Sequence, residues 1–284
     1  MRNTAISPIS RLLIGCTALA SITLSSLTQA DTLDRITESS SVRIGYANEN
    51  PFAYTATDGS VTGESPEIVE KIFQQMGVET INPVLTEWGS LIPGLRASRF
   101  DLIAAGMYIT PARCKQVLFT DPHYQLPDTL LVMAGNPKQL RSYADIADNP
   151  DTKLAIMSGT VNLAYAREAG IKDSQIVQVP DTTSQLQAVR TGRADAAIGT
   201  QLTMKGLADK AGDQVEATTD FMDDPAHTGY GALAFRPEDK ALRDAVNAEL
   251  KKWLGSDEHL QTVAPFGFDR SNITDKTAEE LCSA

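Results

Sequence analysis

The sequence predicts an α/β protein, because segments typical of strands and of helices alternate along most of the chain. Segments typical of strands at 42–46, 81–85 and 101–105 are separated by stretches in which apolar residues recur at helical spacing. This order favours a largely parallel sheet with helices packed against it. The same alternation begins again after residue 150, and a chain of 284 residues commonly forms two domains.

Local signals define the individual elements. Ser65 before a periodic apolar stretch, Pro66 at its first position and Gly77 after it are typical of a capped helix over 65–76. In the first domain we expect a strand at 42–46, that helix, a strand at 81–85, a helix at 90–98 and a strand at 101–105. In the second we expect strands at 153–157, 175–179 and 194–199, alternating with helices at 161–169 and 183–191. A strand at 231–235 and a helix at 238–254 then follow.

These elements predict a discontinuous first domain. We expect it to comprise residues 31–132 and 233–284, and the second domain to comprise residues 133–232. The chain would cross between the domains near 132–136 and again near 228–232.

The first thirty residues have the pattern of a secretory signal peptide. Arg2 and Arg11 precede an uncharged, apolar stretch, and Ala30 is the small residue that precedes the expected cleavage site. No later segment has about 18 consecutive apolar residues, so we expect a soluble protein exported to the periplasm. Anchoring as a lipoprotein through Cys16 is the weaker alternative, because most of the apolar stretch follows that cysteine.

Composition limits the partners and cofactors. The formal net charge is −11, and the expected signal peptide contains two basic and no acidic residues, so the remaining chain is more negative still. An acidic chain repels nucleic acid and anionic membranes, and we expect neither as a partner. We expect a monomer without a cofactor. A metal site is not expected either, because the sequence has no C-x-x-C motif and its three histidines are scattered.

Cys114 and Cys282 are the two cysteines that remain after the expected cleavage. An even number in an oxidising compartment favours a disulfide, which would tie the C-terminal tail to the first domain. Two unpaired thiols are the alternative.

Arg113 is the strongest candidate for a binding residue. It follows Thr110-Pro111 after a buried strand, and ligands of α/β proteins bind near the carboxyl ends of strands. Its guanidinium group offers a planar fork that pairs bidentately with a carboxylate, to which Thr110 would add a hydroxyl group. A surface salt bridge is the alternative role for Arg113.

Three aromatic residues, Phe52, Trp88 and Tyr108, lie in loops or at a strand end of the first domain. Aromatic faces attract cations by roughly 0.5–2 kcal/mol each. Glu49 would add a negative charge beside them. Taken singly, each aromatic residue is also compatible with core packing, and Glu49 with a solvated loop. The sequence contains no G-x-S-x-G, H-E-x-x-H, P-loop or G-x-G-x-x-G motif, which weakens an enzymatic interpretation.

The order and spacing of residues 88–124 resemble the first-lobe signature of periplasmic solute-binding proteins of the polar amino acid type, which feed ABC importers. The resemblance implies a two-lobed, type II periplasmic binding protein fold, with a ligand cleft between two α/β lobes and a two-stranded hinge. It also implies that Thr110 and Arg113 hold a ligand carboxylate, and that the partner is an ABC permease in the inner membrane.

The second lobe departs from family members that bind α-amino acids. Those proteins usually carry an Asp for the ligand ammonium group after the Gly-Arg-x-Asp-Ala strand, whereas this chain has Thr200 there. A zwitterion with a delocalised or substituted cation fits better. Ser158 and Thr160 would contribute hydroxyl and backbone contacts at a helix start, or act only as a helix cap. Asn162 and Thr200 complete the expected second-lobe contacts.

Segments such as Ala47-Asn-Glu49-x-Pro-Phe52, Thr110-Pro-x-Arg113-Cys114 and Glu280-Leu-Cys282 resemble the ectoine- and hydroxyectoine-binding proteins of ABC importers. The resemblance implies an aromatic cage with Glu49, and a carboxylate clamp at Arg113. Other amino acids, opines or betaines are alternative ligands. A more distant alternative is a periplasmic enzyme of the cyclohexadienyl dehydratase type, because fold does not dictate function. Glu49 is the one acid in the expected cleft that would serve such an enzyme.

Overall fold

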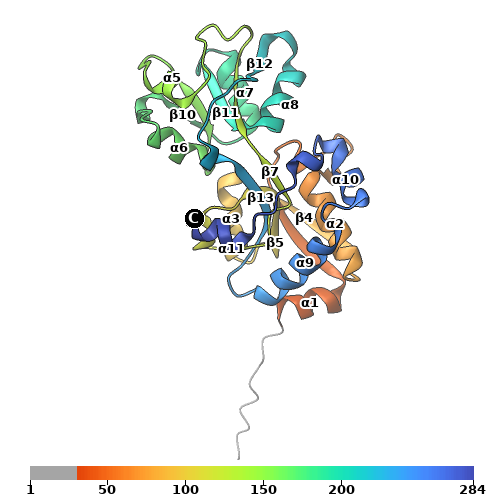
Figure 1. The fold of residues 1–284 in the computed structure, drawn as a ribbon. Coiled ribbons are helices and arrows are strands. Elements are labelled where there is room, and N and C mark those ends of the chain that lie inside the picture. Colours follow the sequence, from red (N-terminus) through yellow and green to blue (C-terminus); the bar gives the residue numbers. More distant parts are fainter. Residues whose placement is uncertain (1–30) are drawn as a thin grey trace, which may run out of the picture. The chain divides into compact units, whose positions relative to one another are not determined.

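Two large β-sheets organise the part of the chain that this computed structural model describes, residues 31–284 (Figure 1). The expected signal peptide, its cleavage site and Cys16 lie outside the described residues. None of the helices between residues 31 and 284 combines the length and the apolar character needed to span a bilayer.

The first sheet has the strand order β4-β1-β5-β13-β6, and β7 also pairs with β13. Its strands are β1 (Ser41–Tyr46), β4 (Thr80–Leu85), β5 (Leu102–Tyr108), β6 (Leu118–Phe119), β7 (Tyr124–Leu126) and β13 (Gly229–Phe235). β1 runs parallel to β4 and β5, whereas β13 runs antiparallel to β5, β6 and β7. The sheet is therefore mixed, and only its β4-β1-β5 part is parallel as expected.

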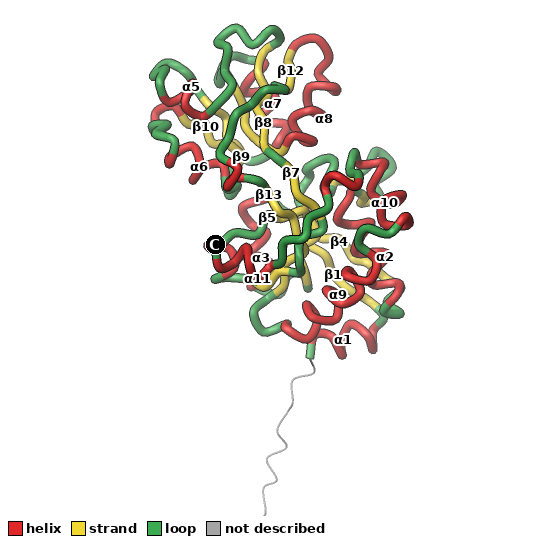
Figure 2. Tube along the Cα trace, viewed as in Figure 1, coloured by secondary structure: helices red, strands yellow, loops and turns green. Residues whose placement is uncertain are grey.

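Helices cover both faces of the first sheet (Figures 1 and 2). They are α1 (Thr32–Ser39), α2 (Glu64–Gln75), α3 (Leu91–Arg96), α4 (Pro111–Cys114), α9 (Lys240–Trp253), α10 (Asp257–Val263) and α11 (Ala278–Ser283). Leu102 and Ala104 of β5 belong to the core beneath α1, α2 and α9, whereas Ile103 and Ala105 belong to the core beneath α3 and α11. Successive side chains of a strand point to opposite faces, so β5 is apolar throughout.

The second sheet has the strand order β10-β9-β11-β8-β12. Its strands are β8 (Asp128–Met133), β9 (Leu154–Met157), β10 (Ile176–Val179), β11 (Ala196–Thr200) and β12 (Val215–Ala217). β9 is parallel to β10 and β11, and β8 is antiparallel to β11 and β12. The helices that pack here are α5 (Tyr143–Ala147), α6 (Asn162–Glu168), α7 (Thr182–Arg190) and α8 (Gln201–Ala211). A separate two-stranded sheet, β2 (Tyr54–Thr55) and β3 (Val61–Thr62), precedes α2.

The chain changes sheets twice. It leaves the first sheet after β7, enters the second at Asp128 and returns with β13 at Gly229. β8 therefore belongs to the second sheet, although all but its last residue fall within the range 31–132 that the sequence analysis assigned to the first lobe. The expected lobe limits at 132/133 and 232/233 stay a prediction, whereas sheet membership changes at Pro127.

Two expected helices differ in detail. The N-cap of α2 is Gly63 rather than Ser65, and the Ser65 hydroxyl group instead donates a hydrogen bond to Glu64 at 2.8 Å. The stretch expected as one helix at 90–98 is a short 3-10 turn over Trp88–Ser90 followed by α3. The helix α8 has no counterpart among the expected elements.

Cys114 and Cys282 are joined by a disulfide bond, which connects α4 to α11. Because Cys114 follows Arg113 directly, the bond fixes the short helix that carries this arginine.

Candidate functional site

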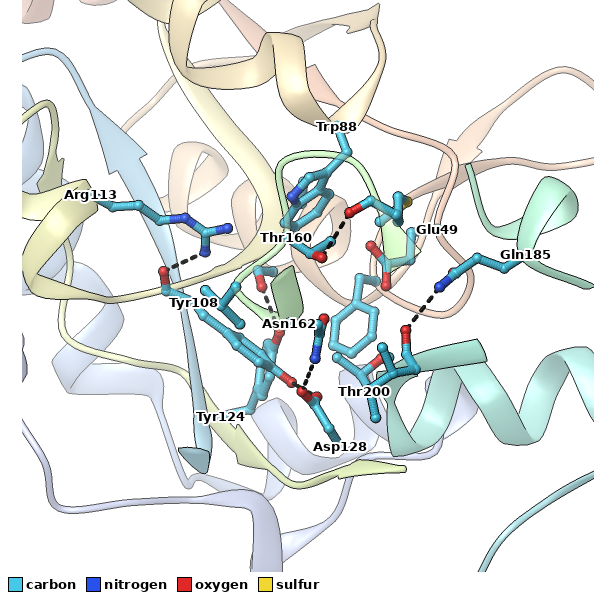
Figure 3. A pocket seen from close by; sticks show the side chains of 17 residues that line it. Glu49, Trp88, Tyr108, Arg113, Tyr124, Asp128, Thr160, Asn162, Gln185 and Thr200 are labelled. Atoms are coloured by element: carbon cyan, nitrogen blue, oxygen red, sulfur yellow. Dashed lines mark hydrogen bonds between the residues drawn. The ribbon is translucent and has the colours of Figure 1, made fainter. Parts of the chain in front are cut away.

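A cavity lies between segments of the two sheets, and the free volume between its lining atoms, mouth included, is about 440 Å³. The first sheet and its loops contribute Glu49, Phe52, Trp88, Ala105, Gly106, Tyr108, Arg113 and Tyr124. The second sheet and its helices contribute Asp128, Met157, Thr160, Val161, Asn162, Gln185, Ile198, Gly199 and Thr200. Figure 3 shows these side chains converging on one space.

Arg113 is positioned by its own short helix. Thr110 is the N-cap of α4, and its hydroxyl oxygen accepts a hydrogen bond from the Arg113 amide at 3.3 Å. The guanidinium group donates to the carbonyl oxygen of Tyr108 at 2.8 Å and to that of Gly159 at 3.2 Å. Its central carbon lies 5.9 Å from the centroid of the Trp88 ring. The side chain thus spans from the first sheet to the second.

The electrostatics of Arg113 favour an anionic ligand. The residue is 8% exposed, and no carboxylate of the described residues pairs with it. Burial lowers its pKa to about 10, so the guanidinium group still carries its charge at neutral pH. A buried charge without a partner costs several kcal/mol, on the order of the energy that a pairing carboxylate would recover.

Aromatic rings form one wall of the cavity. Phe52 packs against Tyr124 with ring centroids 5.2 Å apart, and Tyr124 packs against Tyr108 at 6.3 Å. Gly106, with φ of +63°, allows this wall to approach the backbone, because a Cβ atom there would lie 2.6 Å from the Phe52 ring. The Trp88 Nε1 atom donates to the carbonyl oxygen of Gly159 at 3.3 Å. Trp88 also lines the cavity.

Glu49, the acid expected at the site from the sequence, lines the cavity. It is 7% exposed, and its Oε1 atom accepts a hydrogen bond from the Thr203 hydroxyl group at 3.1 Å. Thr203 in turn receives a hydrogen bond from Thr200 at 2.8 Å. Burial raises the pKa of Glu49 to about 7, and the hydrogen bond from Thr203 opposes this rise. The two threonines connect α8 of the second sheet to an acid of the first.

The sequence did not identify Asp128, a second acid in the cavity. It is the first residue of β8, and it lies opposite Thr200 of β11 in the sheet. Its Oδ1 atom accepts a hydrogen bond from the Tyr108 hydroxyl group at 3.2 Å, and its Oδ2 atom accepts one from Asn162 at 2.5 Å. Burial raises its pKa to about 6, against the opposing effect of these two hydrogen bonds.

The candidate residues from the sequence divide into two groups. Thr110 and Ser158 do not line the cavity. The Thr110 hydroxyl group caps α4, and the Ser158 amide bonds to the carbonyl oxygen of Val179 at 2.9 Å in the backbone next to β10. The others line it: Glu49, Phe52, Trp88, Tyr108, Arg113, Thr160, Asn162 and Thr200.

Tyr124 and Gln185 also line the cavity and were not identified from the sequence. The side-chain amide of Gln185 donates to the carbonyl oxygen of Ile198 at 2.8 Å, which fixes α7 against β11. Asp128 is a charged residue at the start of an apolar strand, but nothing in the sequence connects that position with the cavity. Within residues 31–284, no cluster of three or more His, Cys, Asp or Glu side chains is arranged to hold a metal ion.

The arrangement is suited to binding a small molecule with charges of both signs. Arg113 offers a fork to a carboxylate, the aromatic rings offer faces to a cation, and two acids offer hydrogen-bond acceptors. In Figure 3 the side chains of Arg113, Glu49 and Asp128 reach the cavity from three different directions.

Comparisons with known proteins agree with this geometry. The family model described as bacterial extracellular solute-binding proteins, family 3, matches residues 42–266. A probable amino-acid ABC transporter periplasmic-binding protein of Sinorhizobium fredii is 36% identical, over 97% of this chain and 94% of its own length. The cyclohexadienyl dehydratase of Pseudomonas aeruginosa is more distant, with 27% identity over 64% of this chain and 67% of its own length.

Among solved structures, the crystal structure of EhuB in complex with hydroxyectoine superimposes with a TM-score of 0.84. It is 36% identical in sequence and covers 89% of this chain and 98% of its own. These matches confirm the α/β fold class predicted from the sequence.

Proposed function

Because the chain belongs to the bacterial extracellular solute-binding proteins of family 3, we propose that it captures a small zwitterion outside the cytoplasm and delivers it to the permease of an ABC importer. It has the two-lobed, type II fold of periplasmic binding proteins. We place it in the periplasm as a monomer, released from its signal peptide after Ala30. Its lobes, residues 31–132 with 233–284 and residues 133–232, close around the ligand by a hinge motion.

Arg113 carries the proposal. A buried guanidinium group without a carboxylate partner, beside an aromatic wall, is an arrangement that a ligand carboxylate would complete. We propose that the carboxylate binds Arg113 while the ligand cation lies against Phe52, Trp88 and Tyr108. The N–H groups of the cation would donate to Glu49.

Ectoine or hydroxyectoine is the ligand that we favour. Both are cyclic amidinium carboxylates, so a flat, delocalised cation would face the aromatic rings. The similarity to EhuB, whose crystal structure contains hydroxyectoine, supports this choice. Thr200 supports it as well, because an ordinary α-amino acid would find no acid at that position. Thr160 and Asn162 would complete the site from the second lobe.

One observation favours an alternative ligand class. With Asp128, the cavity contains two acids and one guanidinium group. A cationic amino acid, which has one carboxylate and two positive groups, would match these three charges. An enzymatic alternative is favoured by Glu49 alone, because a carboxyl group with a pKa of about 7 is suited to general acid or base catalysis.

Thermal unfolding of the exported, purified protein tests the proposal. The panel comprises ectoine, hydroxyectoine, glycine betaine and the proteinogenic amino acids. A ligand that binds only the native state stabilises it by about 2.7 kcal/mol at a hundredfold excess over Kd. Stabilisation by ectoines alone is the expected result. Stabilisation by amino acids alone would support a solute-binding protein but would contradict ectoine and hydroxyectoine as its ligands. Turnover of a cyclohexadienyl substrate would overturn the binding-protein function.

A further inference from the structure

Asp128 is a buried acid to which the proposed binding mode has so far given no role. It is 6% exposed, lines the cavity, and lies where the chain enters the second sheet. Its two hydrogen-bond donors come from different halves of the cavity, because Tyr108 belongs to β5 of the first sheet and Asn162 to helix α6, which packs on the second sheet. The carboxylate is therefore oriented from both sides of the cavity, as Figure 3 shows.

The carboxylate of Asp128 keeps capacity for a ligand. An ionised carboxylate accepts about four hydrogen bonds, and described side chains donate two. No Lys or Arg of residues 31–284 forms an ion pair with Asp128. A buried carboxylate without a cationic partner is costly, so a cation that enters the cavity would be attracted to it.

The charges of the cavity wall are unequal. When both acids are ionised, Glu49 and Asp128 carry two negative charges, and Arg113 is the one cationic side chain among the lining residues. If Arg113 binds the ligand carboxylate, both acids are left for the ligand cation. The two acids reach the cavity from different directions, so N–H groups on different sides of one cation can each find an acceptor.

We propose that Asp128 is a ligand-binding residue that, together with Glu49, selects zwitterions whose cation retains N–H donors over zwitterions whose cation is fully methylated. This inference rests on the proposed function. An amidinium, a guanidinium or a protonated amine can donate to both acids. A quaternary ammonium group has no donor and would leave two buried carboxylates without hydrogen bonds from the ligand. Sites that hydrogen-bond a ligand N–H reject an analogue lacking it far more strongly than apolar pockets reject a changed methyl group.

Substitution of Asp128 tests the inference against a matched control. Asp128→Asn keeps the size of the side chain and an oxygen that accepts from Tyr108, but removes the charge. The control is Asp209→Asn, because Asp209 pairs with Lys205 at 2.7 Å in α8 and does not line the cavity. Affinities of both variants and of the wild type are measured by calorimetry for ectoine, arginine and glycine betaine.

For Asp128→Asn we expect at least tenfold weaker binding of whichever N–H-bearing ligand the wild type binds. Binding of glycine betaine should change less than threefold, so the selectivity ratio falls. Asp209→Asn should stay within threefold of the wild type for every ligand. Equal weakening of all ligands by Asp128→Asn, or no weakening of the N–H-bearing ligand, would overturn the role of Asp128 and leave the proposed function intact.

A ligand series on the wild type does not depend on the folding of any variant. Dimethylglycine and glycine betaine differ in that one N–H is replaced by a methyl group. We expect the wild-type protein to bind dimethylglycine at least tenfold more tightly. Equal affinities would contradict the selection. A wild type that binds glycine betaine but neither ectoine nor arginine would also contradict it, and a wild type that binds no zwitterion at all would refute the proposed function itself.

Discussion

The two halves of the cavity differ in how their side chains are positioned. In the first half, Glu49 and Phe52 follow β1, and Tyr108 and Arg113 follow one another at the end of β5. In the second half, Asp128 begins β8, Asn162 begins α6 and Thr200 ends β11. The first half thus depends largely on strand ends and on one short capped helix. The second half depends on how three separate elements pair and pack.

The halves also differ in chemistry. The first half contains the guanidinium group, the aromatic wall and Glu49, which together are enough to bind both charges of a zwitterion. The second half contains amide and hydroxyl groups and one acid, Asp128. We infer that the first half provides most of the affinity and that the second half provides selectivity among cations.

Removal of Arg113 should have the largest effect and tests this division directly. Loss of one partner of a buried charge pair costs about 2–5 kcal/mol, so Arg113→Ala should weaken binding on the order of a hundredfold or more. Thr160→Ala in the second half should weaken it only a few-fold, because the Thr160 hydroxyl group is already bonded to the carbonyl oxygen of Met157 at 2.8 Å. Calorimetric titration with the best ligand measures both. Similar losses in the two variants would contradict the division.

The same difference explains which parts of the site could be predicted. Arg113 was identifiable because a buried strand, Thr110 and Pro111 lie next to it in the chain. Asp128 was not, because it reaches the cavity only through the register that sets β8 opposite β11, with Asp128 facing Thr200. Periodicity describes neighbours along the chain and says nothing of such long-range pairing.

The fold divides in the same way. The continuous apolar strand β5 and the helix α2, with its strong apolar periodicity, were found within a few residues of their observed ends. The antiparallel β13 was assigned correctly as a strand but not in its direction, because direction depends on the path of the chain between the two sheets. The helix α8 was missed, since its apolar residues form only a weak stripe among polar ones.

The two acids provide a smaller test, in stability rather than affinity. Burial raises the pKa of Glu49 from 4.5 to about 7, so between these values the folded chain retains a proton that the unfolded chain has lost. The contribution of this retained proton on Glu49 to the stability of the fold is fully present below pH 4.5 and is lost as the pH rises through about 7. The shift corresponds to about 3 kcal/mol.

We therefore expect the ligand-free Glu49→Gln variant to gain stability relative to the wild type as the pH rises from 5 to 8. Chemical denaturation of both proteins across this range measures the difference. For Asp128→Asn the same gain should be complete about one pH unit lower, because burial raises the pKa of Asp128 only to about 6. A difference from the wild type that does not change with pH would contradict the buried, proton-holding state of these acids.

The smallest expected effect comes from the hydroxyl chain that joins the two halves. Thr203→Val keeps the shape of the side chain but removes the donor to Glu49. Loss of one hydrogen bond to a buried acceptor costs about 1–3 kcal/mol, of which part is recovered when the ligand itself donates to Glu49. We expect a loss of affinity of a few-fold. The pKa of Glu49 should also rise, because this hydrogen bond favours the ionised carboxylate. Binding, which requires the charged form of Glu49, should then begin to fall at a higher pH than in the wild type as the pH is lowered.

Thr218→Val is the matched control, because the Thr218 hydroxyl group bonds to Thr129, and Thr218 does not line the cavity. It should lower stability without moving the pH profile of binding. A shift of that profile in both variants would mean that the threonines act through general packing rather than through Glu49.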